Sequence, residues 1–269
     1  MSIRAIFLTT AIFIGITTLS FGQTSQQNQR AHNTIFSTDW YSLTKDYMTW
    51  YNYTYYNIHL SQNFIGLDLD STEIEKSVFL DKLTSGDLIA FNTSIVNRQP
   101  VYKLFKLNSD DESIKATIKQ MADTEIRNSK MEGTRFPEFG FTDLTGQSYN
   151  NISSIGKLTV LKCWFIHCAA CVKEFPELNA LVNQYQSDSG VQFISLALDK
   201  KSDLIKFLKK EKFKYAVIPE MEFFMKDQLK ITAYPTHMLI DKNGIIIKVV
   251  HTIEELIPFL EKEKSERLP

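Results

Sequence analysis

The spacing of apolar and polar positions changes near residue 134. From there onward, short apolar runs of strand length alternate with longer segments in which apolar residues recur every three or four positions. The first pattern is typical of buried strands and the second of amphipathic helices. Their alternation predicts an α/β domain over residues 134–269, with a central mixed β-sheet flanked by helices. The runs that carry this prediction are "KLTVLKCWF", "AACVKEFPELNALVNQYQ", "VQFISLALD", "KSDLIKFLKKE", "THMLID", "GIIIKVV" and "IEELIPFLEKE".

The last two predicted strands are separated only by "DKNG" at residues 241–244. This is a strong turn signal, and so short a connection joins antiparallel strands. We therefore expect an antiparallel hairpin in an otherwise parallel sheet.

Residues 34–109 have a different character, with many aromatic residues and threonines in strand-like runs. Helix-like spacing of charges is confined to "STEIEKSVFLDKLTSG". These features predict a smaller β-rich N-terminal domain of unknown function. Aromatic residues are enriched in strands, so we expect the tyrosines to pack across neighbouring strands rather than form a peptide or sugar platform. The tyrosines in question are Tyr47, Tyr51, Tyr53, Tyr55 and Tyr56.

Residues 110–133 connect these two regions. Ile114, Ile118 and Met121 follow one another at intervals of four and three positions with charges between them, which is the pattern of an amphipathic helix. Gly133 then marks a boundary. We expect a helical connector that leads into the second domain.

The first 22 residues have the pattern of a secretory signal peptide. A positive charge at Arg4 precedes a short apolar run, and small residues lead up to Gly22, after which we expect cleavage. A membrane anchor is the alternative, but no later stretch approaches the roughly 18 apolar residues of a membrane span. Residues 23–33 are polar and glutamine-rich, which predicts a disordered lead-in. The mature protein is expected in the periplasm, without stable membrane insertion.

Composition and charge narrow the range of functions. The chain has 269 residues, of which 43% are hydrophobic, and this suffices for one large domain or two modest ones. Its 30 basic and 31 acidic residues leave a formal net charge of -1 in short mixed runs, so no strong field is available to attract nucleic acid. We therefore expect no nucleic-acid partner. The 3 cysteines cannot form the even-numbered disulfide framework of a small secreted domain.

Two cysteines lie in "CAAC", where a strand-like run gives way to a helix-like one. Cys168 is expected at the helix N-terminus, where unpaired N–H groups and the helix dipole lower the thiol pKa from its free value of about 8.5. Cys171 lies one turn further on, within the Cα separation of roughly 4.4–6.8 Å that a disulfide needs. Cys168 is then the nucleophile, and Cys171 resolves a mixed disulfide.

Other uses of the cysteine pair fit less well. A zinc site would need a second pair or histidines at helical spacing, and a c-type haem attachment would need histidine where Val172 stands. A local structural disulfide remains as an alternative. We expect a reactive dithiol that uses neither a metal nor an organic cofactor. Cys163, in the strand before the pair, is interpreted as a buried and unreactive thiol.

A second notable stretch is "AYPTHMLID". Pro235 begins a predicted strand, a position where its missing N–H needs no partner. The bond between Tyr234 and Pro235 is also one for which the cis form costs only about 0.5 to 1 kcal/mol. The residues alone leave both interpretations open.

Two of these stretches together resemble the thioredoxin superfamily. "LKCWFIHCAACVKEFPELN", followed about 60 residues later by "YPTHMLIDKNG", is similar to the exported TlpA-like and ResA-like thiol-disulfide oxidoreductases of bacteria. "FPEFGFTDLTGQSYN" also resembles the opening hairpin of that group. The resemblance covers residues 134–265 and implies a thioredoxin-like fold there, whereas residues 23–133 match no family that we can name.

The resemblance implies roles for several residues. Cys168 attacks a substrate disulfide and Cys171 resolves the product. Pro235 follows a cis peptide bond and packs beside the dithiol. The exposed backbone from Tyr234 to Thr236 then pairs with an extended substrate.

By the same resemblance, Glu174 is a partly buried acid that tunes the titration of the dithiol. Desolvation on the Cys171 face of the helix would raise its pKa and let it shuttle a proton, although a solvated glutamate favoured by the helix dipole is an equal alternative. The family often has tryptophan and proline where this chain has His167 and Ala170. A protonated His167 at the substrate site would make the disulfide more oxidising; a plain exposed histidine is the alternative.

The expected function is that of an exported thiol-disulfide oxidoreductase, a reductase rather than an oxidant. By resemblance its partners are disulfide-bearing envelope proteins and a membrane electron donor, in cytochrome c maturation or redox homeostasis. One alternative is a peroxide-reducing enzyme on the same fold, but the residues before Cys168 lack the Pro-X-X-X-Thr-X-X-Cys arrangement. Another is a copper-binding protein that uses both cysteines and a histidine such as His237.

Overall fold

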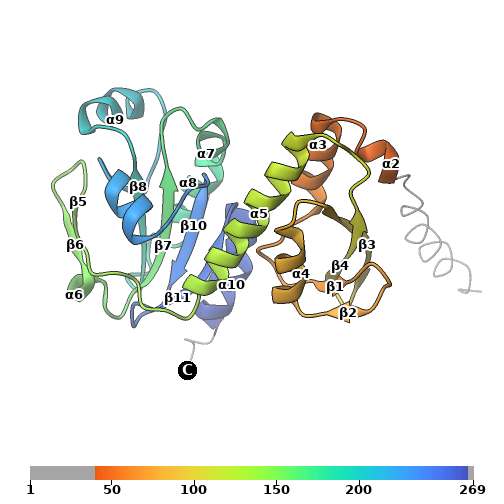
Figure 1. Ribbon diagram of the computed structural model, residues 1–269. Coiled ribbons are helices and arrows are strands. Elements are labelled where there is room, and N and C mark those ends of the chain that lie inside the picture. Colours follow the sequence, from red (N-terminus) through yellow and green to blue (C-terminus); the bar gives the residue numbers. More distant parts are fainter. Residues whose placement is uncertain (1–39, 266–269) are drawn as a thin grey trace, which may run out of the picture. The chain divides into compact units, whose positions relative to one another are not determined.

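The computed structural model describes residues 40–265, and within them the chain forms two larger sheets and a small hairpin (Figure 1). The expected signal peptide and lead-in lie outside the described residues. Among the described helices, none combines the length and the apolar character that a membrane span requires. We refer to residues 40–131 as the N-terminal domain and to residues 133–265 as the C-terminal domain.

The N-terminal domain is built on a sheet with the strand order β2–β1–β4–β3. Asn97 and Arg98 have φ angles of 50° and 65° and form the two-residue turn between β3 and β4, as tight hairpins require. Phe79, Leu104 and Ile114 are fully buried in the core between sheet and helices. The elements are α2 (Trp40–Leu43), α3 (Tyr47–Asn57), β1 (Ile65–Leu67), β2 (Glu73–Ile74), α4 (Lys76–Leu83), β3 (Leu88–Val96), β4 (Gln99–Lys106) and α5 (Glu112–Met131).

The tyrosine-rich run forms helix α3, so the expectation that these tyrosines pack across strands is wrong. Asp46 caps the helix, its carboxylate accepting the backbone N–H of the third residue beyond it at 2.9 Å. Trp50 is buried on one side, whereas Tyr51, Tyr55 and Tyr56 remain exposed. The preference of aromatic residues for strands is a weak prior, and here the cap and the burial of one face outweigh it.

Helix α5 confirms the amphipathic helix expected at this point of the chain. Asp111 caps its start by accepting the Ser113 N–H at 2.8 Å. Ile114, Ile118 and Ala122 are buried in the core of the N-terminal domain. The helix therefore completes that core as well as leading into the C-terminal domain.

The C-terminal domain has a central sheet in the order β11–β10–β7–β8–β9, in which β7, β8 and β9 are parallel and β10 is antiparallel to both neighbours. The predicted β10–β11 hairpin and the opening hairpin β5–β6 are both confirmed. The elements are β5 (Gly140–Thr142), β6 (Ser148–Asn150), α6 (Asn151–Ser154), β7 (Leu158–Trp164), α7 (Ala169–Lys173), α8 (Phe175–Gln184), β8 (Val191–Ala197), α9 (Lys201–Leu208), β9 (Ala216–Ile218), a π-helical turn (Phe224–Gln228), β10 (Thr236–Ile240), β11 (Ile246–Val250) and α10 (Ile253–Ser265). This mixed sheet flanked by helices is the thioredoxin-like fold that the sequence predicted.

Successive residues of strand β7 face opposite sides of this sheet. Val160 and Trp164 belong to the core formed with α8 and α10. Leu161 and Cys163 belong to a separate core on the other side. Both faces of the strand are buried, which explains its nearly continuous apolar run.

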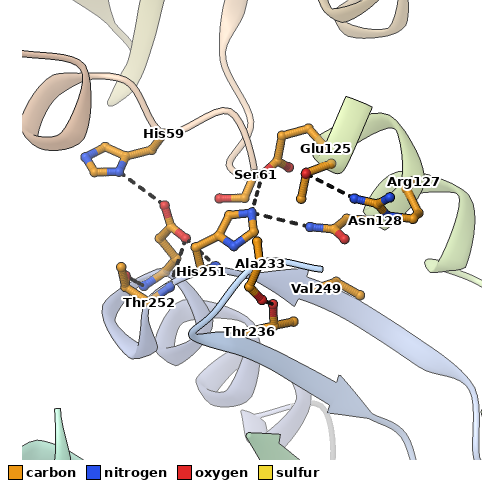
Figure 2. A network of polar contacts seen from close by, with 12 residues as sticks. His59, Ser61, Glu125, Arg127, Asn128, Ala233, Thr236, Val249, His251 and Thr252 are labelled. Atoms are coloured by element: carbon orange, nitrogen blue, oxygen red, sulfur yellow. Dashed lines mark hydrogen bonds and ion pairs between the residues drawn. The ribbon is translucent and has the colours of Figure 1, made fainter. Parts of the chain in front are cut away.

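A network of polar contacts joins the N-terminal domain to the corner between β11 and α10 (Figure 2). His251 Nε2 lies 2.7 Å from Glu125 Oε1 and 3.4 Å from the Asn128 amide, both on α5. His59 Nδ1 lies 3.1 Å from Glu255 Oε1. The second oxygen of Glu255 accepts the backbone N–H of His251 at 3.0 Å. Two histidine–carboxylate pairs thus share one corner of the chain.

The pairing shifts the pKa of each of these groups. The hydrogen bond to Glu255 raises the pKa of His59 against the opposing effect of burial. Burial alone would lower the pKa of His251, but Glu125 outweighs it and the net shift is upward. Burial alone would raise the pKa of Glu255, but His59 and the backbone N–H of His251 lower it to about 2.

These shifts predict the pH range in which the network stabilises the fold. The pKa of Glu255 falls from 4.5 to about 2 on folding, so its contribution is complete above pH 4.5 and is lost as the pH falls toward 2. His59 and His251 have raised pKa values, so their contributions are complete below 6.5 and are lost as the pH rises through the folded values. The free energy of unfolding should therefore be greatest between these limits.

Substitution Glu255→Gln should lower the free energy of unfolding by about 1–3 kcal/mol at mildly acidic pH. The reason is that the His59 ring and the His251 backbone N–H both lose their charged acceptor. Urea unfolding followed across the pH range measures this loss. Glu112→Gln, which removes an exposed partner of Lys115, is the matched control and should change stability by less than about 0.5 kcal/mol. Identical pH profiles for Glu255→Gln and the parent protein would contradict this assignment.

Candidate active site

The loop after strand β7 carries the dithiol into helix α7. The Ile166 N–H donates to Asp199 Oδ2 at 2.8 Å, and the Leu198 N–H donates to the Trp164 carbonyl at 3.2 Å. These contacts tie the loop to the end of the neighbouring parallel strand β8. Asp199 was not predicted as a site residue. A carboxylate close after a buried strand is nevertheless a recognisable signal, because ligands bind at the carboxyl ends of parallel strands.

Cys168 and Cys171 form a disulfide, with their Cα atoms 5.2 Å apart. Cys168 is the N-cap residue of α7, as predicted, and its Sγ accepts the Cys171 N–H at 3.2 Å. Cys168 is 8% exposed and Cys171 is 0% exposed. The helix end therefore stabilises negative charge on the sulfur that an incoming group can reach.

The peptide bond between Tyr234 and Pro235 is cis, which decides between the two interpretations that the sequence left open. Thr236 lies opposite Cys163 in the β10–β7 register, so the cis-proline turn lies at the same end of the sheet as the dithiol. The ring of Tyr234 packs edge-on against Phe165 with centroids 5.4 Å apart. The turn is thus fixed beside the loop that carries Cys168.

Thr236 and His167, both predicted to bind substrate, differ in the exposure of their side chains. The Thr236 side chain is buried and its hydroxyl donates to the Ala233 carbonyl at 2.7 Å, so it holds the turn. Because this side chain is buried, only the backbone of Thr236 could contact a substrate. His167 is exposed in the loop directly before Cys168.

Glu174 lies at the junction between α7 and α8, and Pro176 stands in the first turn of the second helix. Its side chain is only 12% exposed, so the interpretation as a solvated glutamate is wrong. Oε2 accepts hydrogen bonds from Lys162 and from His237, the latter at 3.0 Å. Oε1 accepts the Ile253 N–H at 3.2 Å.

The expected direction of the Glu174 pKa is wrong. Burial alone would raise this pKa, as expected, but the hydrogen bond from His237 and the charge of Lys162 outweigh burial and lower it. Burial lowers the pKa of Lys162, and burial together with Lys162 lowers the pKa of His237. The contacts with His237 and Lys162 therefore favour the ionised form of the Glu174 carboxylate, whereas burial favours the neutral form of the His237 ring.

Lys162 and His237 were not predicted as dithiol residues. His237 was considered only as a copper ligand, and its Nε2 is instead bonded to Glu174. The signal for Lys162 was present, since a lysine in the buried run "LTVLKCW" needs a partner. Within residues 40–265, no three side chains of His, Cys, Asp or Glu gather closely enough to hold a metal ion.

The chain is similar to known proteins over its C-terminal half. Residues 133–249 match the family model described as AhpC/TSA family. Thiol-disulfide oxidoreductase ResA of Bacillus thuringiensis subsp. konkukian is 32% identical over 141 residues, which are 51% of this chain and 81% of that protein. The protein of the same name from Bacillus cereus is 31% identical over 134 residues, which are 48% of this chain and 77% of that protein.

The chain also matches proteins of known structure. The thioredoxin domain of a thiol-disulfide oxidoreductase from Bacteroides vulgatus is 26% identical, covers 49% of this chain and 96% of that domain, and has a TM-score of 0.44. The family match lies within the C-terminal domain, which holds the dithiol.

The three cysteines should differ sharply in reactivity. Burial raises the pKa of Cys163 from 9.0 to about 12, which leaves about a thousandfold less thiolate than in a free cysteine. Brief alkylation of the reduced, folded protein should label Cys168 first and leave Cys163 unlabelled, as mass spectrometry of the peptides will show. The denatured protein, in which all three react, is the control. Labelling of Cys163 as fast as Cys168 in the folded protein would disprove this assignment.

Proposed function

The chain belongs to the ResA-like thiol-disulfide oxidoreductases, and on this premise we propose that its Cys168–Cys171 dithiol reduces disulfides of other envelope proteins. The observation that carries the proposal is the position of the two sulfurs. Cys168 is partly accessible at the start of α7, and Cys171 is enclosed directly behind it. An accessible attacking thiol backed by a sheltered resolving thiol is the arrangement that disulfide exchange needs.

The reaction balances without an organic cofactor. The Cys168 thiolate attacks one sulfur of the substrate disulfide, a mixed disulfide forms, and the other substrate sulfur leaves with the electron pair and takes a proton. Cys171 then attacks the Cys168 sulfur and releases the second substrate thiol. The substrate gains two electrons and two protons, and the enzyme ends with the Cys168–Cys171 disulfide.

The cis-proline turn supports an extended polypeptide as substrate. Tyr234 and Pro235 are partly exposed, and the turn lies at the dithiol end of the sheet. Backbone groups at such a turn pair with an extended chain, and neighbouring side chains then select it. We place Tyr234, Pro235, the Thr236 backbone and His167 at this substrate surface.

Export and partners complete the proposal. The expected signal peptide favours the periplasm, where a reducing dithiol has to be regenerated by an electron donor, and a membrane protein is the donor we propose. The reductive direction and a role in cytochrome c maturation or redox homeostasis rest on the resemblance of the sequence to exported relatives.

The reduction potential tests the direction. Equilibration of the mature protein with glutathione and dithiothreitol buffers should give a value near that of thioredoxin, about -270 mV, rather than that of DsbA, about -120 mV. Cys168→Ser should abolish the transition and the reduction of insulin. A value near the DsbA figure rejects the reductive direction. The absence of any two-electron transition rejects disulfide exchange and favours metal binding, which copper-dependent absorbance would then reveal.

Cys171→Ser should trap the enzyme on its substrates. Without the resolving thiol, the mixed disulfide at Cys168 persists, because no neighbouring sulfur can attack it. Non-reducing electrophoresis of envelope extracts should show high-molecular-weight adducts that dithiothreitol removes. The double substitution of Cys168 and Cys171 by serine is the control and should form none. Rapid consumption of peroxide by the parent protein, without such adducts, would instead support a peroxide-reducing enzyme.

A further inference from the structure

Strand β7 carries a charged side chain in the middle of a buried apolar strand. Lys162 lies between Val160 and Trp164 on the face that α8 and α10 cover, and its side chain is 0% exposed. An isolated buried ammonium group costs several kcal/mol, so it has to be paired or neutralised. Lys162 therefore requires polar partners inside an otherwise apolar core.

These partners come from separate elements. His237 lies opposite Lys162 in the β10–β7 register, and its Nε2 is 3.3 Å from the lysine Nζ. Both side chains contact Oε2 of Glu174, while Oε1 accepts the N–H of Ile253 at the start of α10. We call Lys162, Glu174 and His237 the buried triad. It fixes both oxygens of the carboxylate.

The sequence spacing and the helix relate the triad to the dithiol. Glu174 follows Cys171 by three positions, and side chains three apart on a helical turn are neighbours on one face. Cys171, like Lys162, is fully enclosed, so water does not screen the charges that surround its sulfur. Whatever orients and charges Glu174 therefore acts on this thiol.

We propose that Lys162 and His237 are positioning residues for the exchange reaction, which hold the Glu174 carboxylate ionised and oriented to take the proton of Cys171. The inference rests on the proposed function, because it requires Cys171 to resolve a mixed disulfide. Lys162 supplies the compensating charge. His237 supplies a second donor through Nε2, and within the described part of the chain its Nδ1 has no hydrogen-bond partner.

The step can be written with every atom accounted for. Cys171 gives its proton to the Glu174 carboxylate and attacks the Cys168 sulfur. The bond between Cys168 and the substrate sulfur breaks, and that sulfur leaves with the electron pair. The departing thiolate takes a proton from water, and Glu174 returns its own proton to solvent when the site next opens. The substrate is reduced and the dithiol is oxidised.

Other titratable groups also act on the triad. Most are acidic, so they oppose ionisation of Glu174 and increase the importance of the ammonium group in contact with it. They come from α3, α8, α10 and the segment before β9, and they are Tyr55, Glu177, Glu254, Glu255 and Tyr215.

The test uses the mature protein and an aromatic disulfide, 5,5′-dithiobis(2-nitrobenzoate), as substrate. The reduced protein should release one coloured thiolate when Cys168 attacks and a second when Cys171 resolves the mixed disulfide. The second release is first order, and its rate against pH reports the proton transfer from Cys171. Buried Cys163 contributes no fast phase.

Removal of the ammonium group should alter this profile in a specific way. In Lys162→Met, desolvation of Glu174 is no longer offset, so the carboxylate takes up a proton at a higher pH and a new step appears in the rate of the second release. Below that step the rate should fall about tenfold. In the double variant Lys162→Met/Glu174→Gln the step should be absent, because the titrating group is gone.

Substitutions of His237 test the same inference independently. His237→Leu removes this hydrogen-bond donor and should raise the pH at which Glu174 takes up a proton, whereas His237→Gln retains a donor and should restore most of the parent profile. Lys248→Met is the matched control, because it removes another buried lysine of the central sheet, which pairs with Glu132 at 2.8 Å. It should lower stability and leave the profile of the second release unchanged.

The outcomes separate this inference from the proposed function. If the parent protein shows both releases but Lys162→Met and His237→Leu keep its profile, the inference is wrong and disulfide exchange stands. If the new step of Lys162→Met persists in the double variant, the effect does not pass through Glu174 and the inference is also wrong. If the parent shows no first-order second release, the proposed function fails, and this inference fails with it.

Discussion

The buried ammonium group of Lys162 constrains the whole dithiol region. A charge in the middle of a strand that is covered on both faces is tolerated only with a partner of opposite sign. Glu174 meets this need by turning inward between α7 and α8, and its second oxygen receives the start of α10. One electrostatic requirement thereby fixes the short helix that carries the cysteines and the helix that closes the same face of the sheet.

Much of this architecture could be predicted from the sequence, because it follows from local patterns. The apolar run of β7, the shift to helical spacing after Cys168 and the turn at residues 241–244 each predict their element without reference to distant residues. Pro235 was identified as a candidate cis residue, but its isomer depends on packing around it. The contact between Lys162 and His237 could not be predicted, because the two residues are 75 positions apart and meet only through the strand register.

In the N-terminal domain, local sequence patterns predicted less of the structure. Its aromatic run has strand-like composition, yet the cap at Asp46 and the burial of Trp50 make it helical. The pKa of Glu174 was predicted in the wrong direction for a related reason, since burial can be expected from position but the cations around a buried group depend on tertiary structure. The histidine–carboxylate pairs at His59 and His251 likewise join residues that are far apart in the chain, and no pattern in the sequence predicts them.

The position of the third cysteine limits which disulfides the folded chain can form. Cys163 is only five residues before Cys168, but its side chain lies in the core on the opposite side of the sheet from the dithiol. Once β7 has paired with β8 and β10, the sheet itself separates this thiol from the other two. The finished sheet therefore excludes a disulfide between Cys163 and either cysteine of the dithiol, which leaves Cys168–Cys171 as the pairing within the folded chain.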